Sequence, residues 1–157
     1  MSVSYCARAL IGVRLSHQDL FVQKKVKAFE HPFSETDDVN FDPKTGRPLW
    51  RMGDVCRLNA YAGIELEDFS CVEPIADLDG LYCFHNGNDR AQDRQYLIGL
   101  FAVEEEEDDY HSSTGNFRHL TPEYTSKSYA LCQKVLQPVG LWKVENFGIH
   151  VMQYVSC

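Results

Sequence analysis

Cys83 and His85 are the two residues whose types and spacing are best suited to chemistry. They lie two positions apart in an apolar stretch, and strand side chains alternate between two faces, so this pair would share one face. Thiolate and imidazole groups are preferred zinc ligands, but two of them make only half of a tetrahedral site. His150, Cys56 or Cys71 would have to complete it. The alternative interpretation is a buried cysteine beside a histidine that points toward a turn.

The same residues could instead line a pocket for a small molecule. Such pockets are mostly apolar and carry a few polar groups that orient the ligand. Cys83, His85 and His150 would supply the polar groups, and Trp50 or Trp142 would supply an aromatic wall. Nothing in the pattern specifies a ligand, so the sequence predicts neither a cofactor nor a bound metal.

Two short phrases, His-Ser-Ser at 111–113 and His-Leu-Thr at 119–121, resemble the H-x-[ST] motif of the two-histidine phosphoesterases. In that family the two motifs come from separate strands of a duplicated domain, and their histidines act as acid and base on a phosphate. Here the two histidines are 8 residues apart, and Thr121 is better explained as a helix cap. A small hydrolase or phosphoesterase that uses His85, His111 or His119 is therefore one functional hypothesis.

A run of acidic residues is the most concentrated charge feature of the chain: Glu104, Glu105, Glu106, Glu107, Asp108 and Asp109. The chain has 15 basic and 23 acidic residues and a net charge of −8, most of which this run supplies. Such a balance argues against general affinity for nucleic acids or anionic membranes. The run is either a solvated strand end or a negative patch that docks on a basic partner. Consecutive carboxylates lack the spacing that a calcium loop requires.

Residues 29–50 include the phrase Phe-Asp-Pro-Lys-Thr-Gly-Arg-Pro-Leu-Trp, which resembles the zinc-knuckle turn F-C-P-x-C-G-x-P-x-W of small phage-type zinc-ribbon proteins. In those proteins two cysteines on a tight turn bind one side of a zinc ion, and an upstream Cys/His pair binds the other. Asp42 and Thr45 replace both cysteines here, and only His31 stands upstream. The resemblance therefore implies a degenerate knuckle without metal. An ordinary loop rich in proline and glycine is the alternative.

Hydrophobic alternation predicts strands over 3–15, 20–30, 81–85, 96–104 and 147–155. The first two are joined by a polar turn and are expected to form a hairpin. A helix that begins at Ser16, with Asp19 completing a capping box, is the alternative for that turn. The Asn86-Gly87 pair predicts a second hairpin between the third and fourth strands, because glycine adopts positive φ at low cost.

One helix is predicted after Thr121, which is a good cap, with Pro122 at the first helical position. Pro138 and Gly140 end it. Strands that outnumber helices predict an α+β fold, with a mainly antiparallel sheet and one or two helices packed on a face. Residues 1–157 are expected to form a single domain, with a structured loop at 31–53 and an acidic, polar loop at 104–120.

Six cysteines are scattered through the chain without a C-x-x-C pair, and Arg8 interrupts the first apolar run where a signal peptide needs an unbroken core. No apolar stretch reaches the length of about 20 residues that a membrane-spanning helix needs. The sequence therefore predicts a cytoplasmic protein with reduced, mostly buried thiols.

These observations favour a non-enzymatic binding or regulatory protein that acts on a protein partner through the acidic run. If the resemblance to phage proteins holds, an accessory inhibitor of a host enzyme is the form that it implies. Small-molecule or metal binding is the second hypothesis. Neither direct nucleic-acid binding nor membrane binding is expected.

Overall fold

The protein has an α+β fold in which most strands are antiparallel. The computed structural model describes residues 4–27, 44–47, 50–63, 74–87, 90–102 and 120–156. Its main sheet has four strands in the order β4-β5-β1-β6, and β2 and β3 form a separate pair. The strands are β1 (Ser4–Ser16), β2 (Phe21–Lys27), β3 (Trp50–Cys56), β4 (Tyr82–His85), β5 (Gln95–Phe101) and β6 (Phe147–Ser156).

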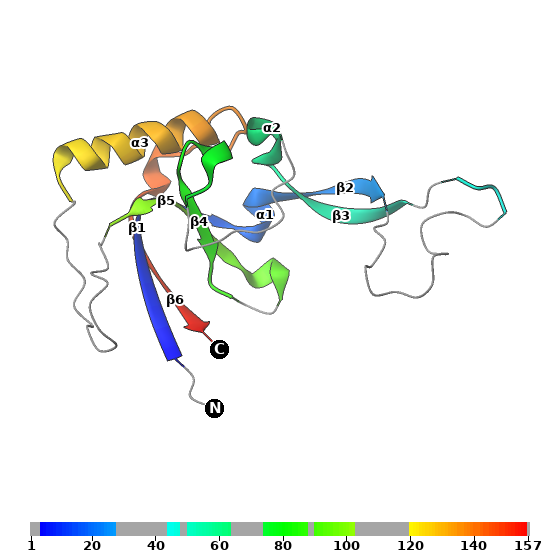
Figure 1. The fold of residues 1–157 in the computed structure, drawn as a ribbon, viewed down its shortest axis with the longest axis horizontal. Coiled ribbons are helices and arrows are strands. Elements are labelled where there is room, and N and C mark those ends of the chain that lie inside the picture. Colours follow the sequence, from blue (N-terminus) through cyan, green and yellow to red (C-terminus); the bar gives the residue numbers. More distant parts are fainter. Residues whose placement is uncertain are drawn as a thin grey trace.

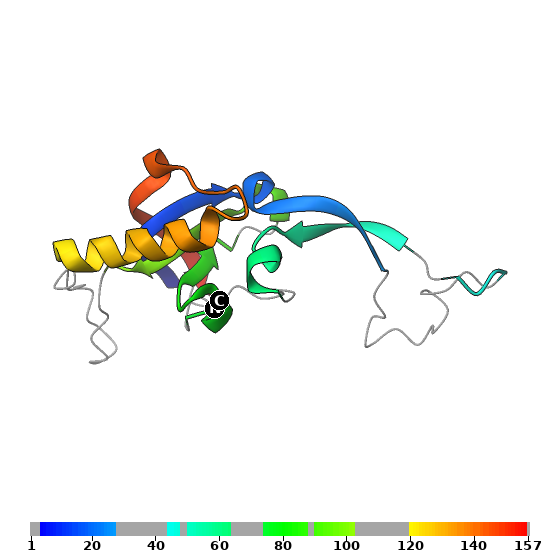
Figure 2. The same cartoon turned by 90° about the horizontal axis from the view of Figure 1, so that it is seen from above.

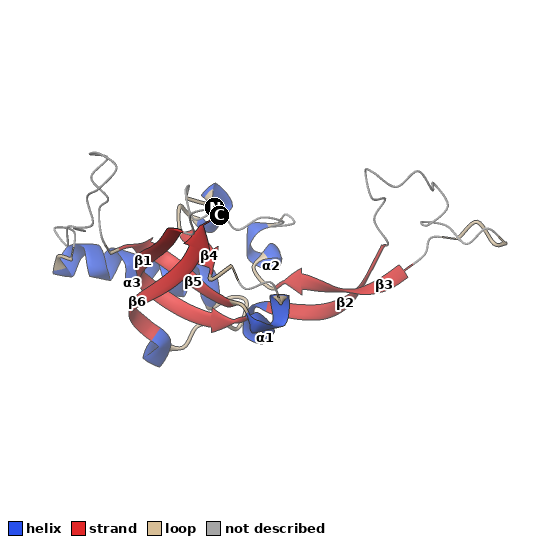
Figure 3. Cartoon of the chain, turned by 90° about the horizontal axis from the view of Figure 1, so that it is seen from below, coloured by secondary structure: helices blue, strands red, loops and turns tan. Residues whose placement is uncertain are grey.

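One long helix crosses a face of the main sheet, and the other helices are short (Figures 1 and 2). The α-helices are α1 (His17–Leu20), α2 (Asn59–Ala62) and α3 (Pro122–Leu136). Single 3₁₀ turns are η2 (Ala76–Leu78), η3 (Ala91–Asp93) and η4 (Val144–Asn146). The β2–β3 pair, which we call the arm, projects away from the main sheet (Figures 1 and 3).

The larger part of the core lies between α3 and the sheet. Its central side chains are Val13, Leu15, Cys83, Tyr96, Ile98 and Leu100 from the sheet and Cys132, Val135 and Leu136 from α3. A smaller cluster contains Leu10, Phe84, Leu97 and Met152. Neighbouring residues of β4 and of β5 divide between the two clusters, as the alternation of strand side chains requires.

Helix α3 begins and ends as the sequence predicts. The Thr121 hydroxyl accepts a hydrogen bond from the Tyr124 backbone N–H at 3.1 Å, and Pro122 occupies the first turn. Ser128 is fully buried, and its hydroxyl donates to the Ile11 carbonyl of β1 at 2.5 Å. A small polar residue at this position therefore lets the helix lie close to the sheet.

The predicted hairpin between the first two strands is wrong. β1 pairs with β5 and β6, whereas β2 pairs with β3. Between them, Ser16 caps the short helix α1 through a complete capping box with Asp19. The capping box starts a helical turn, which redirects the chain out of the main sheet and into the arm.

The later elements match their predictions more closely. β4 and β5 pair antiparallel around the Asn86-Gly87 turn, and Gly87 has the positive φ of 72° expected there. The last strand, β6, also lies where hydrophobic alternation predicts it. The loop expected at 31–53 overlaps the arm, because β3 begins at Trp50.

Candidate functional site

The short helix α1 joins the arm to the main sheet, and its first residue is the centre of the candidate site. The Asp19 carboxylate accepts hydrogen bonds from the Ser16 hydroxyl at 2.8 Å and from the Ser16 backbone N–H at 3.2 Å. These bonds lower the pKa of Asp19. The His17 backbone N–H donates to the Arg94 carbonyl at 3.1 Å, so the turn is also fixed to the chain just before β5.

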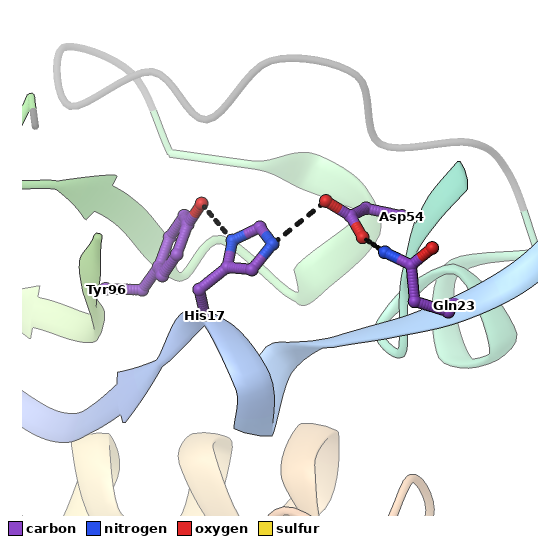
Figure 4. Close-up of polar contacts among 4 residues, drawn as sticks. All are labelled: His17, Gln23, Asp54 and Tyr96. Atoms are coloured by element: carbon purple, nitrogen blue, oxygen red, sulfur yellow. Dashed lines mark hydrogen bonds and ion pairs between the residues drawn. The ribbon is translucent and has the colours of Figure 1, made fainter. Parts of the chain in front are cut away.

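His17 joins side chains from both sheets (Figure 4). Its imidazole is buried, with 9% of the residue exposed. Nε2 lies 3.0 Å from Asp54 Oδ2 in β3, and Nδ1 lies 3.3 Å from the Tyr96 hydroxyl in β5. The ring stacks on Phe21 of β2, with centroids 4.5 Å apart and planes at 17°. Gln23 donates to the other carboxylate oxygen of Asp54. We call these four hydrogen-bonded side chains the His17 junction.

The partners of His17 determine which nitrogen carries the proton. A carboxylate only accepts hydrogen bonds, so Nε2 donates to Asp54. In the neutral ring, Nδ1 then accepts from the Tyr96 O–H. Burial raises the pKa of Tyr96, and the nearby Arg94 opposes this shift. The Tyr96 hydroxyl therefore keeps its proton, with which it donates to a neutral ring.

A histidine held between a tyrosine and a carboxylate has the form of an acid–base relay. A relay needs a reacting group within hydrogen-bond reach. Here Tyr96 is 2% exposed and His17 is 9% exposed, while the Asp54 side chain is 38% exposed but bound by His17 and Gln23. The junction therefore links the arm to the main sheet, which together with α3 we call the body.

His85, predicted from sequence as a ligand-binding residue, lies next to this junction. Its ring meets the edge of Tyr96, with centroids 5.6 Å apart, and its Nδ1 accepts from the Gly87 backbone N–H at 2.9 Å. Burial lowers the pKa of His85, and the positive charge of Arg94 lowers it further. A neutral imidazole is therefore favoured at the end of β4.

Cys83 shares the face of β4 with His85 but is enclosed in the core. It is a free thiol with no exposed surface, and burial raises its pKa well above the ordinary value. Burial also raises the pKa of Cys56 to about 11 and that of Cys132 to about 12. All three groups are therefore neutral thiols at physiological pH, whereas metal binding and nucleophilic attack need the thiolate.

We expect these three thiols to resist alkylation in the native protein. At pH 8 a thiol with a pKa of 11 is a thiolate in only about one molecule in a thousand. Iodoacetamide followed by peptide mass mapping should label Cys56, Cys83 and Cys132 only after denaturation. Rapid native labelling of Cys83 would show that its site is open.

The other two residues predicted to line a ligand site lie elsewhere. His150 is in β6, separated from β4 by two strands, and its Nε2 donates to the Asn146 carbonyl at 2.9 Å. Trp50 begins β3 in the arm. Cys83, His85, His150 and Trp50 therefore do not surround one common site. Within the described ranges, no three His, Cys, Asp or Glu side chains are grouped so that they could hold a metal ion.

Two other predicted features fall largely outside the described residues. The whole acidic run, Glu104–Asp109, lies there. Of the phrase that resembles a zinc knuckle, the structure describes residues 44–47 and Trp50, but neither Asp42 nor the upstream His31.

One face of the arm continues outward from the His17 junction. Cross-strand partners share a face, and the pairs from the base outward are Phe21 with Cys56, Gln23 with Asp54, Lys25 with Met52, and Lys27 with Trp50. The first pair packs in the core and the second belongs to the junction. Beyond them, Met52 is 62% exposed and Trp50 is 48% exposed. The Lys25 ammonium lies over the Trp50 ring, 5.8 Å from its centroid. We call Lys25, Met52 and Trp50 the outer arm face.

Sequence reasoning did not identify the His17 junction. The capping box at Ser16 was a signal for the turn, but it gave no reason to join His17 to Asp54 and Tyr96. These residues belong to a helix and to one strand of each sheet, and no spacing in the sequence relates them.

Searches among protein families, curated proteins and solved structures found no match to this chain. In the part of the chain that the structure describes, no helix is both long enough and apolar enough to cross a membrane. The functional argument therefore depends on the geometry of the chain itself.

Proposed function

We propose that this chain is a non-enzymatic binding protein that regulates a protein partner, and that the outer arm face is its main contact surface. The observation that carries the proposal is the exposure of Trp50 (48%) and Met52 (62%) on one face of a projecting ribbon (Figure 1). Tryptophan and methionine are enriched at the centres of protein interfaces. Ile149 and Val151 of β6 form a second exposed pair, but they are aliphatic, whereas Trp50 and Met52 are of the types that interfaces favour and lie on the projecting arm.

The His17 junction supports this function because it holds the base of the arm. A two-stranded ribbon is marginally stable in water unless other groups pack against it. Stacking of His17 on Phe21 and hydrogen bonding to Asp54 tie both strands of the arm to the sheet. A pre-ordered contact surface loses less conformational entropy when it binds.

The acidic run, Glu104–Asp109, is proposed as a second contact with the same partner. Its charge would attract a basic surface and accelerate the encounter. By contrast, the alternative of a metal or small-molecule site gains no support from Cys83, which is enclosed in the core.

Replacing Trp50 and Met52 together with alanine should weaken partner binding by at least about thirty-fold, because central aromatic residues are typical hot spots. The matched control is Ile149→Ala with Val151→Ala, which removes an equally exposed apolar pair from β6. Affinity is measured by calorimetry with the protein partner captured in cells that naturally produce the chain. Equal affinity of the Trp50/Met52 variant and the control would overturn the proposed role of the arm.

The same assay tests the acidic run. Serine and glycine in place of Glu104–Asp109 should slow association and reduce its salt dependence, while dissociation changes little. Unchanged association at low salt would exclude the run from the interface.

A further inference from the structure

We infer that the protein partner presents an extended acidic segment with interspersed apolar side chains, and that this segment adds as a third strand to an edge of the arm. This inference rests on the proposed function and specifies the partner's chemistry. Three features of the arm support it: the strand edges that the described chain leaves unpaired, the charges of the two strands, and the exposed side chains of Met52 and Trp50.

Each strand of the arm has one edge that the described chain leaves unpaired. β2 and β3 bond only to each other in the sheet topology of the described residues. Such edges are templates for pairing with another chain, and proteins often use them to bind extended peptides. The edge of β3 is the one that fits, because a strand added there would place its side chains beside Met52 and Trp50, which the two-stranded ribbon leaves exposed.

The charge of the arm selects an acidic strand. β2 and β3 together contain Lys24, Lys25, Lys27 and Arg51 but only one acidic residue, Asp54. The Asp54 carboxylate is already engaged by His17 and Gln23. The two strands carry a net charge of +3, whereas the segment that joins them, residues 28–49, carries −3. The attraction of an acidic segment is therefore local to the strands, because salt screens exposed charges beyond about 10 Å.

The outer arm face also defines where the partner's apolar side chains lie. Lys25 shares this face with Met52 and Trp50. A strand added beside them would direct alternate side chains toward the same face, so acidic and apolar residues should alternate there. A single-stranded nucleic acid fits less well, because it has no extended peptide backbone with which to pair along the edge of β3.

Synthetic peptides test this inference directly. The probe carries alternating leucine and aspartate on one face of a strand and threonine on the other. One control peptide has lysine in place of aspartate, and another carries N-methyl groups at alternate backbone positions to block strand pairing. Oligothymidylate tests the nucleic-acid alternative. Binding is followed by Trp50 fluorescence in a Trp142→Phe background.

The aspartate peptide should bind at least about tenfold more tightly than either control peptide and than oligothymidylate. Lys24→Glu with Lys25→Glu should weaken its binding about tenfold. Lys127→Glu with Lys143→Glu, an equal charge change at exposed positions on the body, should leave it nearly unchanged. Equal binding of the lysine or N-methylated peptide, no peptide binding at millimolar concentration, or tighter binding of oligothymidylate would overturn the inference.

Failure of this inference and failure of the proposed function give different results. If the native partner loses affinity with the Trp50/Met52 variant but is indifferent to the charge reversal at Lys24 and Lys25, the arm is the contact surface and the partner's segment is not acidic. If the Trp50/Met52 variant retains full affinity, the proposed function itself fails.

Discussion

Replacing Gly12 or Gly99 with alanine is expected to destabilise the protein by about 4 kcal/mol or more, the largest effect of any single substitution considered. The two glycines face each other in the β1–β5 pair. A β-carbon on Gly12 would overlap the Ile98 carbonyl oxygen and lie 2.6 Å from Gly99 Cα. A β-carbon on Gly99 would similarly lie 2.7 Å from Gly12 Cα.

The expected cost is large because backbone atoms cannot rotate away. A flexible side chain could yield to a new methyl group, whereas here the two central strands would have to separate. Ser128 of α3 donates to the Ile11 carbonyl directly beside this contact, so separation would also disturb the helix. The core between α3 and the sheet would therefore loosen together with the strand pair.

Gly148 provides the matched control. It pairs with Gly12 on the other side of β1, yet a β-carbon there would meet nothing within 4 Å. Gly148→Ala should change the free energy of unfolding by less than about 1 kcal/mol in either direction. Urea denaturation of the three variants measures the difference. Equal stability of Gly12→Ala and Gly148→Ala would mean that β1 and β5 do not approach this closely.

Replacing His17 with phenylalanine is expected to release the arm from the body. Phenylalanine keeps a ring that can stack on Phe21 but removes both hydrogen bonds, to Asp54 and to Tyr96. Loss of polar contacts in a buried network costs about 2 to 3 kcal/mol. The loss should concentrate in β2 and β3, because the main sheet keeps its own pairing.

Hydrogen exchange at individual amides measures this effect. In the His17→Phe variant, amides that join β2 to β3 should exchange about thirty-fold faster or more, while amides that join β1 to β5 should change little. Gln23→Ala is the milder comparison, since it removes only the outer hydrogen bond to Asp54. If protection falls equally in both sheets, His17 stabilises the whole fold and does not specifically hold the arm.

The sequence predicted those elements that depend on local signals. Helix α3 follows from Thr121 and Pro122, whose capping effect acts within one turn. The pairing of β4 with β5 follows from the Asn86-Gly87 turn at the start of their connection, residues 86–94, because strands that are consecutive in the sequence usually pair. In both cases the decisive residues lie within or next to the element they define.

Pairing between distant segments was not predictable in the same way. The alternation in β1 and β2 identifies two strands, but it does not state that β1 pairs with β5 and β6. The capping box at Ser16 carries the decisive information, because it starts the helical turn that separates β1 from β2 and excludes a hairpin between them. The His17 junction was unpredictable for the same reason, since it exists only once β2–β3 and β5 are brought together.

The described residues form two parts that differ in how far their apolar side chains are buried. The main sheet and α3 provide the core, and Cys83, which looked suited to chemistry, belongs to that core. The arm, by contrast, leaves the large apolar side chains of Trp50 and Met52 exposed to solvent. Function is therefore assigned to side chains that the fold leaves unburied.

Photo-cross-linking from the outer arm face shows whether the arm contacts a protein partner. A benzoylphenylalanine introduced at Met52 is compared with one at Val144, an exposed apolar residue of the body, in cells that naturally produce the chain. We expect the benzoylphenylalanine at position 52 to give one dominant protein adduct, and we expect the additional change Trp50→Ala to remove it. The benzoylphenylalanine at position 144 should not give this adduct. Adducts of equal yield from both positions, or none from Met52, would contradict the claim that the arm engages a protein partner.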